Sequence, residues 1–272
     1  RHAIATVNGT AALHASLVVA GVKPGDEVLV PALTFVGTAN PVAAMGAHAH
    51  FVDCARDTLG VDPSALALHL DKTTSMRDGR CINNHTGRAV RALIVTHVLG
   101  HICDMERLGD LARRHGLALV EDAAEALGSQ RNGCHAGHWG HLATLSFNGN
   151  KIVTTGGGGA ILVQDDELAH RVRHLTTTAK IKHPWAFQHD EIGFNYRMPN
   201  LNAALGVAQL TRLGDLVDAK RRLSVRYAHL FADIAGVEYY SEVPGNKGNQ
   251  WLCLLLLENS AERDALLSAA HA

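Results

Sequence analysis

The chain has 272 residues, of which 47% are hydrophobic and 19% are charged, and its formal net charge is −1. This composition predicts a soluble globular protein with a sizeable core. It argues against a nucleic-acid partner, because nonspecific binding to nucleic acid needs clustered Lys and Arg. No apolar run reaches the roughly 18 residues that a membrane span requires, so we expect no membrane partner either.

Strand-like and helix-like runs alternate through the first 200 residues. In chain order, the patterns predict a helix at 10–20, a strand at 27–31, a helix at 35–45, a strand at 48–53, a helix at 63–70, a strand at 92–97, a helix at 104–115, and strands at 117–121, 143–147 and 160–164. This alternation is typical of the α/β class, with a mostly parallel sheet covered by helices on both faces.

The pattern changes after Pro199. Residues 200–235 have apolar positions at helical spacing with charges between them, which predicts one long helix or two abutting helices. A strand-like run at 251–257 and a helix-like run at 261–270 follow. We therefore expect one domain over residues 1–200 and the start of a smaller, truncated domain over residues 201–272. The sequence opens Arg1-His2-Ala3 without a Met or a signal peptide, so we expect a fragment.

Cysteine and histidine usage favours neither disulfides nor a metal. The five cysteines are scattered without a C-x-x-C pair, which indicates reduced thiols in a cytoplasmic protein. The 18 histidines are spread along the chain. Their closest groups lie in alternating or Gly-rich stretches, so we expect no metal site.

Lys151 stands in an unusual position, after an Asn-Gly-Asn turn and before four consecutive glycines. A P-loop needs glycine directly before the lysine and Ser or Thr after it, whereas Asn150 precedes Lys151 and Ile152 follows it. The glycines also run into a strand-like segment instead of opening a helix, which argues against a dinucleotide fingerprint.

Two other features lie where ligands bind in parallel α/β sheets, beyond the carboxyl ends of strands. Asp122 follows the predicted strand at 117–121, and Asn8-Gly9-Thr10 precedes the first predicted helix. The start of that helix is a phosphate site or an ordinary N-cap. Together with Lys151, these features suggest pyridoxal 5′-phosphate (PLP), which needs a Schiff-base lysine, an acid at its pyridine nitrogen and a phosphate cup.

Five segments, spread in order over nearly the whole chain, resemble the DegT/DnrJ/EryC1/StrS family of nucleotide-sugar aminotransferases. They are N-G-T-A-A-L-H (8–14), G-D-E-V-L-V-P-A-L-T-F-V (25–36), E-D-A-A-E-A-L-G-S (121–129), S-F-N-G-N-K (146–151) and G-F-N-Y-R-M (193–198). The resemblance implies the fold-type I, aspartate-aminotransferase-like fold of PLP enzymes, with a mostly parallel seven-stranded sheet. Residues 146–159 most resemble the branch that aminates UDP-4-keto-6-deoxy-N-acetylhexosamines, on routes to bacillosamine and legionaminic acid.

The same resemblance implies a role for each matching residue. Lys151 would hold the cofactor covalently and move the proton, and Asp122 would pair with the pyridine nitrogen. The implied phosphate and ring contacts are Thr10, the Ala11 backbone, Ser146 and the ring-stacking Phe35. Asn195 would reach the phosphate from the neighbouring subunit, which makes the active site a property of a homodimer.

Position 125 departs from the family pattern. Many members carry Gln or His near the cofactor's phenolic oxygen, whereas this chain has Glu125. Glu125 marks the N-acetylhexosamine branch or, alternatively, points to solvent. We interpret Trp139 and Trp251 as packing residues, and leave His97 as either a pocket residue or a structural histidine.

The resemblance therefore implies a PLP-dependent aminotransferase that moves an amino group from glutamate to C4 of a nucleotide-linked keto sugar in the cytoplasm. The alternatives are a PLP-dependent sugar dehydratase and a non-catalytic relative that binds a nucleotide sugar. Dehydratases of this kind typically replace the lysine with histidine. The presence of Lys151 and Asp122 argues against both alternatives.

Overall fold

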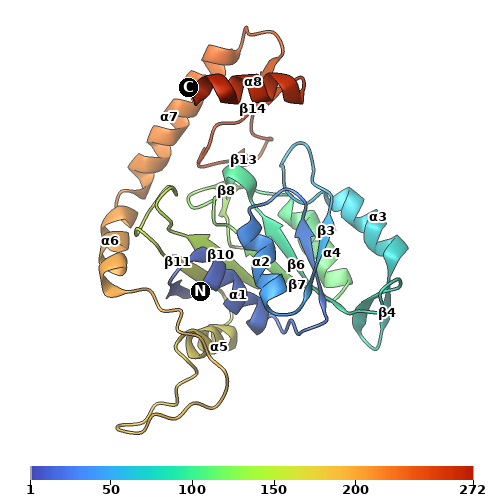
Figure 1. The fold of residues 1–272 in the computed structure, drawn as a ribbon, viewed down its shortest axis with the longest axis vertical. Coiled ribbons are helices and arrows are strands. Elements are labelled where there is room, and N and C mark those ends of the chain that lie inside the picture. Colours follow the sequence, from blue (N-terminus) through green and yellow to red (C-terminus); the bar gives the residue numbers. More distant parts are fainter. Residues whose placement is uncertain (1, 272) are drawn as a thin grey trace.

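A seven-stranded sheet forms the centre of the protein, whose residues 2–271 are described by a computed structural model (Figure 1). The strand order is β1-β11-β10-β7-β6-β2-β3, and only β11 runs antiparallel to the others. The strands are β1 (His2–Thr6), β2 (Glu27–Pro31), β3 (His48–Val52), β6 (Val90–Thr96), β7 (Ala118–Asp122), β10 (Leu142–Ser146) and β11 (Gly159–Val163). The predicted mostly parallel seven-stranded sheet is confirmed.

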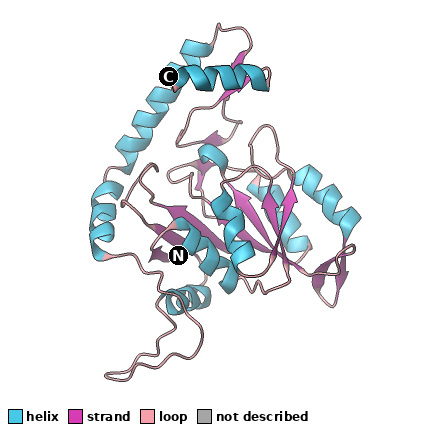
Figure 2. Ribbon diagram, viewed as in Figure 1, coloured by secondary structure: helices cyan, strands magenta, loops and turns pink. Residues whose placement is uncertain are grey.

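Helices cover both faces of this sheet (Figure 2). Helices α1 (Gly9–Val19), α2 (Val36–Ala44) and α5 (Asp166–Thr176) pack on one face, and α3 (Pro63–Thr73) and α4 (Met105–Arg114) pack on the other. Successive side chains of a strand point to opposite faces, so Val28 and Val30 join the first layer while Leu29 joins the second. Because both layers are apolar, the central strands are continuous apolar runs.

Helix α5 was not among the predicted elements. Its start is nevertheless marked by local signals, because the Asp165 side chain accepts a hydrogen bond from the Leu168 N–H, and Asp166 and Glu167 lie in the first turn. The chain also forms small strands outside the main sheet. They are β4 (Thr74–Arg77) with β5 (Arg80–Asn83), β8 (Gln130–Arg131) with β9 (Cys134–His135) and β13 (Asn246–Lys247), and β12 (Val237–Tyr239) with β14 (Leu255–Leu257).

The C-terminal part leads away from the sheet along two helices, α6 (Asn200–Leu210) and α7 (Leu213–Phe231), and ends in α8 (Ser260–Ala270) (Figure 1). Of the two predictions for residues 200–235, one long helix or two abutting helices, the second is therefore right. The predicted strand at 251–257 is wrong for its first half, since only Leu255–Leu257 is a strand. Gln250 has a φ of +54°, and the Trp251 N–H donates to Asn249 Oδ1 instead of to a neighbouring strand. None of the helices within residues 2–271 is long and apolar enough to cross a membrane.

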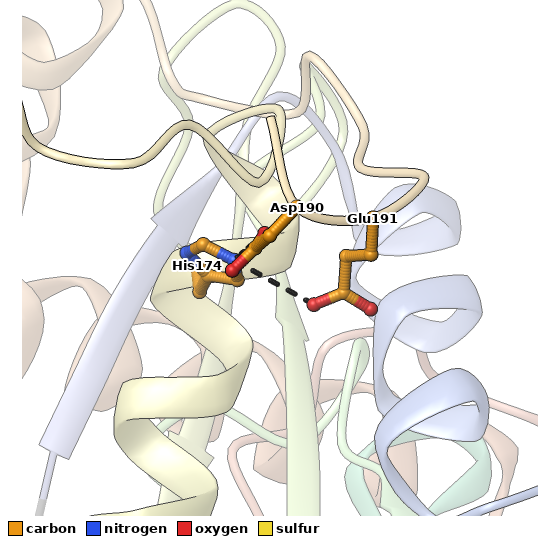
Figure 3. Close-up of side chains that lie close together, drawn as sticks. All are labelled: His174, Asp190 and Glu191. Atoms are coloured by element: carbon orange, nitrogen blue, oxygen red, sulfur yellow. Dashed lines mark hydrogen bonds and ion pairs between the residues drawn. The ribbon is translucent and has the colours of Figure 1, made fainter. Parts of the chain in front are cut away.

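A long loop joins α5 to α6 and extends from the body beyond α5 (Figure 1). Its return segment is fastened to α5 by polar contacts, of which Figure 3 draws those of His174 with Asp190 and Glu191. His174 Nε2 lies 2.7 Å from Asp190 Oδ1, and the Arg171 guanidinium donates two hydrogen bonds to Glu191. Within residues 2–271, His174, Asp190 and Glu191 form the one group of three potential metal ligands. Because Arg171 already neutralises Glu191, we interpret the group as an anchor for the loop.

Candidate active site

A cavity of about 280 Å³ lies at the carboxyl ends of β6, β7 and β10, next to the first turn of α1. This is the edge of a parallel sheet where ligands bind. The residues that line it are Asn8, Gly9, Thr10, Leu13, Phe35, Gly37, Thr96, Asp122, Ala124, Glu125, Ser146, Asn148, Asn150, Lys151 and Trp251.

Asp122, the last residue of β7, has a side chain that is held in one orientation. Its Oδ2 accepts a hydrogen bond of 2.7 Å from the Thr38 hydroxyl, and its Oδ1 accepts one of 3.2 Å from the Ala124 N–H. The residue is only 4% exposed, and burial raises the pKa of its carboxyl although these donors and Lys151 oppose the shift. The carboxyl group is thus held in a fixed orientation at the cavity wall and is largely shielded from solvent.

Lys151 follows β10 and reaches the same cavity. Its Nζ lies 3.7 Å from Glu125 Oε1 and 3.7 Å from the centre of the Trp251 ring. Burial lowers the pKa of the Lys151 ammonium, and the charges of Glu125 and Asp122 partly offset this effect. A lysine with a lowered pKa is more often neutral, which is the form that can act as nucleophile or base.

Glu125 points into the cavity and not to solvent, so the solvent alternative for this residue is wrong. Its Oε2 accepts a 2.7 Å hydrogen bond from the Leu99 N–H, and its side chain is 13% exposed. Burial raises the pKa of the Glu125 carboxyl, while the Leu99 N–H and Lys151 act in the opposite direction. Leu99 itself has a φ of +55°, a conformation that is unusual for a non-glycine residue.

The first turn of α1 forms one end of the cavity. Asn8 is the N-cap, and its Oδ1 accepts a 2.7 Å hydrogen bond from the Ala11 N–H. The N-cap interpretation is therefore right, and the turn also lines the cavity through Gly9 and Thr10. Because Asn8 already occupies the Ala11 N–H, the first-turn donors that remain for an anion are those of Gly9 and Thr10.

The predicted site residues divide into two groups. Thr10, Phe35, Asp122, Glu125, Ser146 and Lys151 all line the cavity. Ala11 lies behind it and is 7% exposed, and Asn195 is exposed and lies outside the cavity of its own chain.

Sequence reasoning missed the roles of Thr38 and Trp251. Trp251 does pack in the core, at 7% exposure, but its face also lies against Lys151, so the packing interpretation is incomplete. Thr38 is separated from Asp122 by more than 80 residues, and no local pattern connects the two. Its position in the predicted helix at 35–45, three residues after the ring-stacking candidate Phe35, was the one available signal.

His97 has a structural role. It is fully buried, its Nε2 lies 2.9 Å from Glu121 Oε2, and it is absent from the cavity lining. Burial alone would lower the pKa of His97, but Cys103 and Glu121 raise it to about 10. Glu121 also accepts hydrogen bonds from the N–H groups of Gly137, Trp139 and Gly140. This buried pair fixes the end of β7 and so the position of Asp122.

The sheet order, the buried acid at the end of β7 and the lysine after β10 define the class of fold-type I PLP enzymes. Comparison with known proteins gives the family: the DegT/DnrJ/EryC1/StrS aminotransferase family matches residues 1–272, and the chain belongs to it. Aminotransferases of this family depend on PLP.

Individual relatives agree with this assignment. The chain is 41% identical over 223 residues to the GDP-perosamine synthase of Caulobacter vibrioides, covering 82% of this chain and 56% of that protein. It is 34% identical over 266 residues to the GDP-perosamine synthase of Escherichia coli O157:H7, and this match covers 98% of this chain and 68% of that protein. A solved aminotransferase of the family from Brucella abortus superposes with a TM-score of 0.88 at 30% identity, covering 100% of this chain and 69% of that one. The chain thus spans about half to two thirds of the length of its relatives.

Proposed function

We propose that the full-length protein is a PLP-dependent aminotransferase that transfers an amino group from glutamate to C4 of a UDP-4-keto-6-deoxy-N-acetylhexosamine. The observation that carries the proposal is the shared cavity of Lys151 and Asp122, in which a lysine of lowered pKa and a buried carboxyl face one space. Membership of the aminotransferase family supports the reaction class.

The chemistry of the residues fits the cofactor. The cavity offers an amine at Lys151, a carboxyl at Asp122, and hydroxyl groups of Thr10 and Ser146 beside the first turn of a helix. A phosphate needs several such donors, and a helix N-terminus favours negative charge. Phe35, which is 71% exposed, lines the same cavity and offers an aromatic face for a planar ring.

Each of these residues then has a task. Bound PLP supplies an electron-withdrawing ring that stabilises negative charge beside the reacting nitrogen. Asp122, held by Thr38 and Ala124, keeps a proton on the ring nitrogen. Lys151 would hold the cofactor at rest and would carry the proton during transfer, a role that its lowered pKa favours. Glu125, 3.7 Å from Lys151 Nζ, can share a proton at this end of the cavity.

Two observations disagree on which nucleotide the sugar substrate carries. The stretch at 146–159 and Glu125 favour a UDP-linked N-acetylhexosamine. The names of two relatives, both GDP-perosamine synthases, favour a GDP-linked sugar instead. The dehydratase and the non-catalytic alternatives receive less support, because Lys151 and Asp122 are both present in the cavity.

We also propose a homodimer with shared active sites. Asn195 lies outside the cavity of its own chain, which suits a residue that serves a neighbouring one. The loop before it exposes large apolar side chains, with Trp185 and Phe187 each 80% exposed and Ile192 85% exposed. Exposed apolar groups of this kind are common at protein interfaces.

Two experiments test the proposed function in the full-length protein. After borohydride reduction, peptide mass spectrometry is expected to find a pyridoxyl adduct on Lys151. An adduct on Lys180 or Lys182, or on no lysine, would contradict the cofactor assignment.

The second experiment is a panel of UDP-, dTDP- and GDP-linked 4-keto sugars assayed with glutamate as donor. We expect amination of a UDP-4-keto-6-deoxy-N-acetylhexosamine. If only GDP- or dTDP-linked sugars are aminated, the branch assignment fails while the reaction class stands. No amination of any sugar, together with the adduct on Lys151, would favour the non-catalytic or dehydratase alternative.

A further inference from the structure

Trp251 comes from the far end of the described chain and meets the lysine turn in two ways. Its indole Nε1–H donates a 2.7 Å hydrogen bond to the carbonyl oxygen of Asn150, the residue directly before Lys151. The centre of its ring lies 3.7 Å from Lys151 Nζ. The same side chain thus holds both the backbone and the ammonium of the lysine.

The segment around Trp251 is itself fastened to the other side of the cavity. Asn249 is fully buried, and its Nδ2 donates to the carbonyl oxygens of Glu125 and Leu127, at 2.8 and 2.9 Å. Its Oδ1 accepts from the Trp251 N–H. One short turn therefore links the loop that carries Glu125 to the turn that carries Lys151, and it sets the spacing between the two charged groups.

We propose that Trp251 is a positioning residue for Lys151, whose indole face stabilises the ammonium while its N–H fixes the lysine turn. This inference rests on the proposed function, since positioning matters only if Lys151 is the reacting amine. A cation over an aromatic face within about 6 Å is attracted by the ring quadrupole, most strongly for Trp and when water is excluded. Residues that only fill space need no such alignment.

The charged groups that face Lys151 are Glu125 and Asp122, and both favour its ammonium form against the effect of burial. The indole face acts in the same direction. Replacing it by an aliphatic side chain such as Leu removes this stabilising contact and keeps the lining apolar, so the pKa of Lys151 should fall. Phenylalanine keeps a π face but loses the N–H to Asn150.

The test measures Lys151 in full-length protein freed of cofactor. Labelling with isotope-coded acetic anhydride from pH 6 to 11, followed by peptide mass spectrometry, gives a midpoint that reports the pKa and a plateau that reports accessibility. For Trp251→Leu we expect the midpoint to fall by about half a unit to one unit, the size of a cation–π contact. For Trp251→Phe we expect less than half of that fall. Trp139→Leu, a packing tryptophan outside the cavity, is the matched control and should leave the midpoint unchanged.

A purely structural role for Trp251 would change thermal stability or the plateau but not the midpoint. An unchanged midpoint in Trp251→Leu, a rise, or equal falls in the Leu and Phe variants would each overturn the proposal. If Trp251→Leu does not fold, Trp251→Met replaces it with the same expected fall, because Met fills irregular space without a π face. The labelling uses no cofactor, so an unchanged midpoint together with a pyridoxyl adduct on Lys151 would overturn this inference alone.

Discussion

At the scale of single residues, the site depends on two adjacent carboxyl groups whose pKa values the fold shifts in opposite directions. Burial raises the pKa of Asp122, whereas the pKa of its neighbour Glu121 is held low. Burial also acts to raise the pKa of Glu121, but His97 and the N–H groups of Gly140 and Gly137 outweigh it. Adjacent positions in β7 thus serve different purposes, one facing the cavity and one anchoring the strand.

Asp122→Asn should keep the fold and lower transamination at least about 100-fold, the scale expected when a fixed charge partner of the reacting group is lost. Asparagine can still accept the Thr38 hydroxyl but cannot keep a proton on a ring nitrogen. Steady-state rates and cofactor content of the full-length variant would check this. Asp233→Asn, at an exposed aspartate, is the control. Near-normal turnover would show that Asp122 is not the partner of the ring nitrogen.

Glu121→Gln should lower the free energy of unfolding by about 3 kcal/mol, because removing one partner of a buried pair leaves the other uncompensated. The low folded pKa of Glu121 gives stability above about pH 4.5 that is lost in more acidic solution. The raised pKa of His97 gives stability below pH 6.5 that is lost as the pH rises toward 10. In urea unfolding, the free energy of unfolding of Glu121→Gln should therefore differ most from that of the wild type between about pH 4.5 and pH 6.5.

The exposed Glu167→Gln is the matched control and should change the unfolding free energy by less than about 0.5 kcal/mol. A difference between wild type and Glu121→Gln that stays constant from pH 4 to 10 would contradict the charged pairing with His97.

At the scale of elements, Gly159, the last glycine of the run and the first residue of β11, allows α1 to pack closely. A Cβ atom added at Gly159 would lie 2.6 Å from the Asn8 carbonyl carbon and 2.7 Å from the Gly9 nitrogen. The backbone of Gly159 therefore passes close to the start of α1, the end of the cavity that we assign to phosphate. At Gly157, an added Cβ would meet no atom within 4 Å.

Gly159→Ala should push the first turn of α1 away from Ser146 and weaken PLP binding about tenfold or more, while Gly157→Ala in the same run should bind normally. Titration of cofactor-free protein with PLP, followed by absorbance, measures both affinities. Equal affinities in the two variants would show that the spacing between α1 and β11 does not control the phosphate end of the cavity.

The sequence predicted those elements whose signals are local. The central strands are apolar runs, and the predicted strand at 27–31 coincides with β2. Asp122 and Lys151 could be found because Asp122 ends a strand and Lys151 lies in the turn after one. The contacts of Thr38 and Trp251 could not, since each joins segments some 80 to 100 residues apart and depends on tertiary packing. Trp251 lies in an apolar stretch that favours a strand, whereas in the structure it follows the left-handed Gln250 and bonds to Asn249.

At the scale of the whole molecule, we propose that residues 1–200 form one domain and that residues 201–272 begin a second, smaller one. Turn 249–251, near the end of the chain, completes the cavity of the sheet. The anchored loop between α5 and α6 instead extends from the body beyond α5 (Figure 1). In a homodimer such a loop could carry Asn195 to the neighbouring site.

Two inactive full-length variants, Lys151→Ala and Asn195→Asp, should regain activity when refolded together. In a mixed dimer, the site built on the Asn195→Asp chain keeps its own Lys151 and receives Asn195 from its partner, while the other site carries both lesions. Activity should approach half of the sites in each hybrid. Inactive hybrids, with subunit exchange confirmed by mass spectrometry, would mean that Asn195 serves its own chain.

The order of strands in the sheet has a consequence for synthesis on the ribosome. β1 pairs along its whole length with β11, and roughly 150 residues separate the two in the chain. At about 5 to 20 residues per second, the nascent chain carries β1 unpaired for roughly 8 to 30 s. During that time α1 lacks the Gly159 backbone beside its first turn, and Lys151 has not yet met Trp251. PLP should therefore bind only after most of the chain has been synthesised.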